Sequence, residues 1–305
     1  EMRLFNDRLG LDLTWYNKKS KDEILLAPAS LTSGYSSVVL NIGELRNRGF
    51  ELLLSGSPLK TDNFNWTSSF NGSVNDNKVI SLAAEQSSLA VLNGESRSEN
   101  GFIQQIVGKP ANQIMAFDYE YDASGNIVTN PETGVPERGD LKPWGSGFHK
   151  WTGGWNNEFS YKGVNLSFLI DGKFGGKIFS ATDFYAYNAG LHKATLDRER
   201  TFGTSNVSAQ VYYSGLAQNV SREFVLNANF IKFRQAAIGY TFPGRTFNNR
   251  IQGATLSLVG RNLFTIMKKT DNIDPESIYN GVAQGLELGG VPPVRTFGLN
   301  LNVRF

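Results

Sequence analysis

The sequence contains no cysteine and only two histidines, His149 and His192. Without cysteine it can form neither disulfides nor thiolate metal sites. It also lacks the Gly-x-Ser-x-Gly elbow that presents a nucleophilic serine, and no carboxylate pair is singled out for acid–base catalysis. We therefore expect the chain not to be an enzyme and to have no catalytic site and no cofactor.

Long apolar runs and charge are also scarce. No stretch approaches the 18 or so apolar residues of a transmembrane helix, although strands of membrane barrels give only a weak hydropathy signal. Charged residues make up 19%, the net charge is +2, and no basic block with interleaved aromatics occurs, so we expect no nucleic-acid partner. The chain is instead rich in aromatics (12%) and glycine (32 residues), which favours an all-β fold with many turns.

The last ten residues, 296–305, show the clearest pattern. Apolar and polar residues alternate strictly, which predicts a β-strand with two different faces. Ten residues is also the length of a tilted membrane-spanning strand. In a membrane barrel we expect Asn300, Asn302 and Arg304 to face the lumen and Phe297, Leu299, Leu301 and Val303 to face lipid.

The same alternation recurs along the chain and predicts about nine antiparallel strands. Connections after the first, third, fifth and seventh are short, and the others are long, about 25 to 75 residues, which is the plan of outer-membrane barrels. Since such barrels have even strand counts and the chain opens on a strand, we expect it to be a piece of a longer chain whose missing strands lie N-terminal. The expected strands cover residues 2–4, 9–16, 50–55, 64–74, 155–161, 166–174, 230–242, 256–261 and 296–305, and residues 181–196 have helical character.

Motifs spread along the chain occur in the order of one known family. Arg8–Lys19 reads RLGLDLTWYNKK, and Gly239–Pro243 and Gly260–Phe264 read GYTFP and GRNLF. With these motifs the chain resembles the C-terminal barrel portion of SusC/RagA-type TonB-dependent transporters of the Bacteroidetes outer membrane. Further matching stretches are Gly34–Val39, Asn47–Leu52, Asn75–Val79, Val107–Pro110 and Asp274–Glu276.

This resemblance implies an integral outer-membrane protein with a 22-stranded barrel and a folded plug in its lumen. Residues 1–305 would form one C-terminal barrel domain, with the plug and the N-terminal strands absent. The family imports nutrients with energy from TonB acting through the plug, and a SusD-like surface lipoprotein covers the extracellular loops. The first expectation for the cargo is an oligosaccharide and the second a peptide. The terminal Phe305 resembles the aromatic ending that barrel-assembly machinery recognises.

Aromatic side chains in the long connections are candidates for contact with cargo or with the lipoprotein lid, since they can stack on sugar rings or grip peptide side chains. The alternative is that they pack loop against loop. The candidates are Trp144, Trp151, Tyr185, Tyr187, Tyr212 and Tyr213.

Two carboxylate clusters could bind Ca²⁺, which takes six to eight oxygen ligands. Neither has EF-hand spacing, so a structural calcium is a minor alternative to no metal. The clusters are Asp118, Glu120 and Asp122, and Asp271, Asp274 and Glu276.

A second function remains open from the residues alone, a soluble β-sandwich that binds glycans at the cell surface. The two functions differ in what the apolar strand faces touch. A transporter exposes them to lipid, whereas a sandwich buries them against a second sheet.

Overall fold

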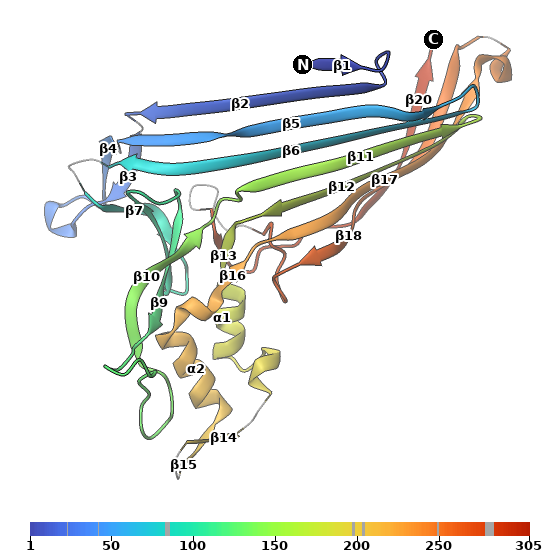
Figure 1. Ribbon diagram of the computed structural model, residues 1–305. Helices are drawn as coiled ribbons and strands as arrows, with labels where there is room; N and C mark the ends of the chain where they lie inside the picture. Colours follow the sequence, from blue (N-terminus) through green and yellow to red (C-terminus); the bar gives the residue numbers. More distant parts are fainter. Residues whose placement is uncertain are drawn as a thin grey trace.

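The computed structural model describes residues 1–22, 24–41, 43–82, 86–196, 199–202, 205–248, 250–277 and 284–305. Its main feature is a nine-stranded antiparallel sheet whose strands lie side by side in the order in which they occur along the chain (Figure 1). The predicted all-β fold and the nine strands are confirmed. The strands are β1 (Met2–Leu4), β2 (Leu9–Lys21), β5 (Glu44–Lys60), β6 (Phe64–Ser81), β11 (Trp151–Tyr161), β12 (Val164–Phe174), β17 (Phe230–Pro243), β18 (Gly253–Lys268) and β20 (Thr296–Arg304).

The connections follow the predicted rhythm. Residues 61–63 and 162–163 make short turns at one end of the sheet, while all the long connections leave from the other end (Figure 1). Both residues of the turn Lys162–Gly163 have positive φ. Two-residue hairpin turns favour glycine at the second position for this reason. The sheet is therefore a curved meander with a turn rim and a loop rim.

Several strands are longer than the sequence predicted. β2 continues five residues beyond Tyr16 to Lys21, and β6 continues beyond Val74 to Ser81. In these extensions both faces carry polar residues, so the period-two alternation that marks a strand disappears. The connection between the expected strands 9–16 and 50–55 therefore consists of two strand extensions joined by a hairpin. The hairpin is made of β3 (Ile24–Pro28) and β4 (Ser37–Asn41), with the one-turn 3₁₀ helix η1 (Leu31–Ser33) between them.

The other long connections fold into a separate body at the loop rim, which we call the loop subdomain. It contains a four-stranded sheet in the order β10-β9-β8-β7, a three-stranded sheet in the order β16-β13-β19, and two helices packed together (Figure 1). The sequence predicted helical character at 181–196, which α1 confirms, but did not predict α2 or the four-stranded sheet. Its elements are β7 (Ser88–Glu95), β8 (Gly101–Ile106), β9 (Gln113–Tyr119), β10 (Arg138–Ser146), β13 (Lys177–Ser180), α1 (Ala181–Asn188), η3 (Lys193–Thr195), β14 (Glu199–Phe202), β15 (Ser205–Ser208), α2 (Ala209–Asn219), η4 (Ser221–Phe224), β16 (Val225–Asn227) and β19 (Leu286–Glu287).

The hydrophobic core lies in the loop subdomain rather than under the large sheet. Phe179, Phe184 and Phe224 are fully buried there, together with Ile103 and Ile114. Serines start both helices, and each accepts a hydrogen bond from the backbone N–H three residues on, as good N-caps do. Among the described residues no helix is both long and apolar enough to span a membrane.

Candidate functional site

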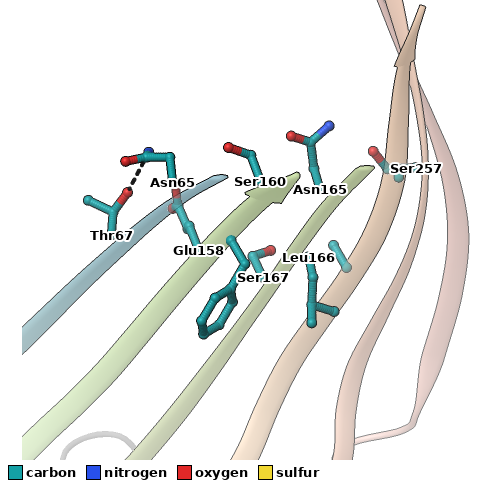
Figure 2. Close-up of a pocket in the computed structure, with 11 residues that line it drawn as sticks. Asn65, Thr67, Glu158, Ser160, Asn165, Leu166, Ser167 and Ser257 are labelled. Carbon is teal, nitrogen blue, oxygen red and sulfur yellow. Dashed lines mark hydrogen bonds between the residues drawn. The ribbon is translucent and has the colours of Figure 1, made fainter. Parts of the chain in front are cut away.

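The concave candidate site is the polar face of the large sheet, which we call the lumen face. Cross-strand register aligns polar residues on it, for example Asn65 opposite Ser160 and Ser160 opposite Asn165. Near the turn rim this face holds a cavity of about 350 Å³ with amide and hydroxyl side chains around it (Figure 2). Its polar lining residues are Asn65, Thr67, Glu158, Ser160, Asn165, Ser167 and Ser257.

Nearer the loop rim the lumen face carries an ion-pair network. The ammonium of Lys232, only 4% exposed, lies 2.8 Å from both carboxylate oxygens of Asp274 and 2.7 Å from Glu276. Arg234 donates a two-pronged hydrogen bond to Asp171 and a third bond to Glu276. Because Asp274 and Glu276 belong to a long connection, this network ties that connection to β12 and β17.

The charges of this network determine the pKa of Glu276. Burial by itself raises the pKa of this carboxyl, but hydrogen bonds from Arg234 and Lys232 outweigh it and lower the pKa from 4.5 to about 2. Glu276 therefore stays ionised at any physiological pH, and the loop attachment does not depend on pH near neutrality.

A second network holds the loop subdomain together. The Asp118 carboxylate on β9 accepts hydrogen bonds from Lys142 at 3.0 Å and Arg222 at 2.6 Å. The guanidinium of Arg222 also stacks on the rings of Tyr119 and Trp144. Burial raises the pKa of Asp118, yet its hydrogen bonds to the two cations give a net lowering.

The aromatic candidates divide into packed and exposed residues. Tyr213 is 3% exposed and meets the ring of Tyr187 edge to face, with 5.7 Å between centroids. Tyr212 packs on Tyr213, and Trp144 donates its indole N–H to the backbone of β9. All four pack loop against loop, but only Tyr213 is buried; Trp144, Tyr187 and Tyr212 are half-buried, and their contact with cargo or a lid stays a prediction.

Two candidates remain accessible. Tyr185 on α1 is exposed and its hydroxyl donates to the backbone carbonyl of Arg97. Trp151 is 52% exposed, but it begins strand β11 and lies on the apolar face of the large sheet with Trp155. This corrects the expected position of Trp151 in a loop. Contact of either residue with cargo or with a lid stays a prediction.

The two carboxylate clusters considered for calcium are engaged by other groups. Asp118 binds Lys142 and Arg222, Asp271 binds Lys193 at 2.7 Å, and Asp122 accepts bonds from its own turn. Within the described part of the chain, no group of three or more His, Asp or Glu side chains is placed to hold a metal ion. Most of these carboxylates are therefore already paired with other groups of the chain.

The opposite face of the large sheet, the outer face, is apolar and largely exposed. Aromatic rings stack from strand to strand along it, from Trp66 through Phe159, Phe168 and Phe233 to Phe264. In the described residues no second sheet covers these side chains. A β-sandwich would bury them, so the structure gives no support to that alternative.

The strands that carry the apolar outer face are long enough to cross the apolar layer of a membrane. β11 has 11 residues, Trp151–Tyr161, which at about 3.3 Å per residue gives a length of about 33 Å. A tilt of about 40°, usual for barrel strands, reduces this to about 25 Å, the height of the apolar band of outer-membrane barrels.

The final strand takes its predicted place. β20 pairs with β18, with Leu299 opposite Leu258 and Asn300 opposite Ser257. Apolar residues therefore continue the outer face and polar residues the lumen face. Leu299 is 76% exposed and Phe305 is 88% exposed. The roles expected for Phe305, Asn300, Asn302 and Arg304 stay predictions.

The antiparallel sheet has a polar concave face, an apolar outer face and long connections at one rim only. These are the features of an outer-membrane β-barrel wall. Residues 2–91 match the family model described as "TonB dependent receptor-like, beta-barrel". TonB-dependent receptor P3 of Formosa agariphila is 26% identical over 340 residues, covering all of this chain. TonB-dependent receptor SusC of Bacteroides thetaiotaomicron is 26% identical over 319 residues, covering 98% of it.

Solved structures of similar fold are also known. The RagAB peptide importer in its closed-closed state superposes with a TM-score of 0.77 at 21% identity over 99% of this chain, and another structure of the RagAB peptide transporter gives 0.75 at 19%. The chain is similar throughout to SusC/RagA-type TonB-dependent receptors, so the resemblance seen in the sequence is confirmed. It spans about one third of the length of these relatives (33% of P3 and 34% of the RagAB chain), as expected for one portion of a larger barrel.

The ion pairs of the two networks could not be predicted from the sequence. Lys232, Arg234 and Lys142 lie in or beside strands, and their partners are at least 24 residues away in the chain. The available signal was the presence of Lys and Arg on the lumen faces of β12 and β17 near acidic connections. Only the sheet register decides which cation meets which carboxylate.

Proposed function

We propose that the chain forms part of the wall of a TonB-dependent importer that carries nutrients across the outer membrane. One observation carries this proposal: a single sheet presents an exposed apolar band of membrane height on its outer face and an amide- and hydroxyl-lined surface on its concave face. Similarity over the whole chain to TonB-dependent receptors supports it. In this role the chain would be an integral outer-membrane segment without catalytic activity.

We propose an oligosaccharide as the cargo. The lumen cavity offers Asn, Ser and Thr side chains with one carboxylate, Glu158, and no cation among its lining residues. Such a surface suits neutral polyhydroxylated molecules, because hydroxyls and amides can both donate and accept hydrogen bonds. A peptide is the second candidate, since the two solved relatives are described as peptide transporters.

We also propose a SusD-like lipoprotein as the partner at the loop rim, with TonB acting through a plug supplied by the remainder of the protein. The loop subdomain supports this role because it is a folded body with its own core, held to the sheet by the Lys232 network. Tyr185 on its surface is the first candidate for contact with the lid or the cargo.

Uptake in cells tests the function. Deletion of the gene is expected to abolish uptake of fluorescent oligosaccharides, and the intact gene is expected to restore it. Uptake of labelled peptides, measured in parallel, separates the two cargo classes. Unchanged uptake of both after deletion would contradict the proposal, and co-purification of a surface lipoprotein with the tagged receptor tests the partner.

A further inference from the structure

Three cations lie side by side on the outer face near the loop rim. In the sheet register Lys19 of β2 is directly opposite Arg46 of β5, and Arg46 is directly opposite Lys78 of β6. Like charges in directly opposed positions of a sheet repel each other and destabilise it. An arrangement of this kind suggests an anion that compensates the repulsion.

Nearby carboxylates compensate only part of this charge. Glu44 pairs with Lys19 at 3.1 Å, and Asp76 pairs with Arg48 at 2.9 Å and more distantly with Arg46 at 3.8 Å. No ion pair within the described residues reaches Lys78, and the Arg46 Nε atom has no hydrogen-bond partner there. With Lys21 on the same face, five cations stand against these two carboxylates.

The cationic row lies just outside the apolar band. Four residues below it on the same strands is an aromatic row, Trp15 opposite Phe50 and Trp151 opposite Val74 and Phe174. Aromatic belts of this kind mark the boundary between lipid and water. At about 3.3 Å per residue the cations lie about 13 Å beyond this boundary measured along the strand, which is the region of lipid headgroups.

Directly below the aromatic row the outer face is hollowed. Gly153 on β11 is opposite Gly72 on β6 and Gly172 on β12, so three glycines form a continuous row across the strands. With no side chains to fill it, this row is part of a groove of about 520 Å³. Its large lining residues are almost all apolar: Leu13, Phe50, Phe70, Trp151, Trp155 and Phe174.

We propose that this surface binds one phosphorylated lipid of the outer membrane leaflet. Its phosphate groups lie against Lys19, Arg46 and Lys78, and an acyl chain occupies the groove above the glycine row. Charge complementarity identifies the headgroup, since lysine and arginine are the side chains that bind phosphate most strongly. The inference rests on the membrane location in the proposed function, because only then does the outer face meet lipid.

The test uses the full-length receptor purified in detergent and incubated with lipid A, either with its phosphates or after enzymatic dephosphorylation. Native mass spectrometry measures how much lipid the protein retains. The triple variant Lys19→Gln, Arg46→Gln, Lys78→Gln is expected to bind phosphorylated lipid A roughly a hundredfold more weakly than the wild type. The control triple variant Lys60→Gln, Lys162→Gln, Arg245→Gln, with the same charge change at the turn rim, is expected to match the wild type.

Thermal unfolding gives a second readout that does not depend on retention. Because the triple variant loses the ion pairs with Glu44 and Asp76 as well as the repulsion, the readout is the change in Tm when lipid is added to each protein. Phosphorylated lipid A is expected to raise the Tm of the wild type and not that of the variant.

Equal retention by wild type and variant, or equal binding of dephosphorylated lipid A, would overturn the inference. Recovery of the receptor as a monomer without detergent would instead overturn the proposed function. The two failures can therefore be told apart.

Discussion

The ammonium of Lys232 lies 2.8 Å from each carboxylate oxygen of Asp274. This contact joins strand β17 to a connection that is 42 residues further along the chain. Replacing Lys232 with Met leaves Asp274 and Glu276 with a buried, partly uncompensated charge, which costs about 3–5 kcal/mol for a buried pair. We expect amide hydrogen exchange in residues 269–277 to become much faster in this variant.

Lys173 provides the matched control. It reaches Glu276 at 3.6 Å from a side chain that is far more exposed than that of Lys232. An exposed pair contributes only about 0–1 kcal/mol, so Lys173→Met is expected to leave exchange in residues 269–277 nearly unchanged. Equal effects of the two substitutions would show that burial of Lys232 does not determine the attachment.

The attachment should also respond to acid. The pKa of Glu276 is lowered in the fold from 4.5 to about 2, so its contribution to stability is fully present above pH 4.5 and is lost as the pH falls towards 2. We expect protection of residues 269–277, corrected for the intrinsic exchange rate, to be constant from pH 7 to 5 and to decrease below 4.5. The variant Glu276→Gln should lack this dependence, and a wild-type loss centred near neutral pH would contradict the assignment.

Substitution of Tyr213 should destabilise the fold far more than substitution of Tyr185, although the sequence predicted the same role for both. Tyr213→Ala removes a ring from the core of the loop subdomain and is expected to cost about 3–5 kcal/mol, as for other buried aromatics. Tyr185→Ala removes one hydrogen bond at the surface and is expected to cost about 1 kcal/mol. Thermal unfolding measures both, and a lipoprotein pull-down is expected to weaken for a folded Tyr185→Ala variant.

Deletion of Phe305 is expected to lower the amount of assembled barrel in the outer membrane. Phe305 directly follows β20 at the turn rim, and its ring is 88% exposed in this chain. Quantifying the folded receptor by its heat-modifiable migration in gels tests this, with cargo affinity of the assembled fraction unchanged. Normal membrane levels would remove the assembly role.

The strands that cross the apolar band could be predicted from the sequence because each residue there has one of two environments. Between Phe64 and Val74 the alternation of apolar and polar residues records the outer and lumen faces directly. Beyond Val74 both faces are wet, so Asn75–Lys78 carries no such record although the strand continues. The prediction failed where the solvent on the two sides became the same.

The loop subdomain could not be predicted for a different reason. Its core joins Ile103, Phe179, Ala217 and Leu286, which come from three separate connections. No single segment therefore shows a complete hydrophobic periodicity. Buried polar contacts in this subdomain are equally distant in sequence. The carboxylate of Glu287 accepts hydrogen bonds from Ser180 and Thr182, which are more than 100 residues away.

The measurement that tests the account most directly is the environment of alternate residues along β20. This chain has no cysteine, so a cysteine introduced at one of positions 297 to 303 can carry a nitroxide label in a membrane-reconstituted receptor whose remaining portion is free of cysteine. We expect labels at 297, 299, 301 and 303 to be accessible to oxygen from lipid, and labels at 298, 300 and 302 to a water-soluble nickel reagent. Equal accessibility of both sets to the water-soluble reagent would contradict a strand with one face in lipid and the other on the lumen.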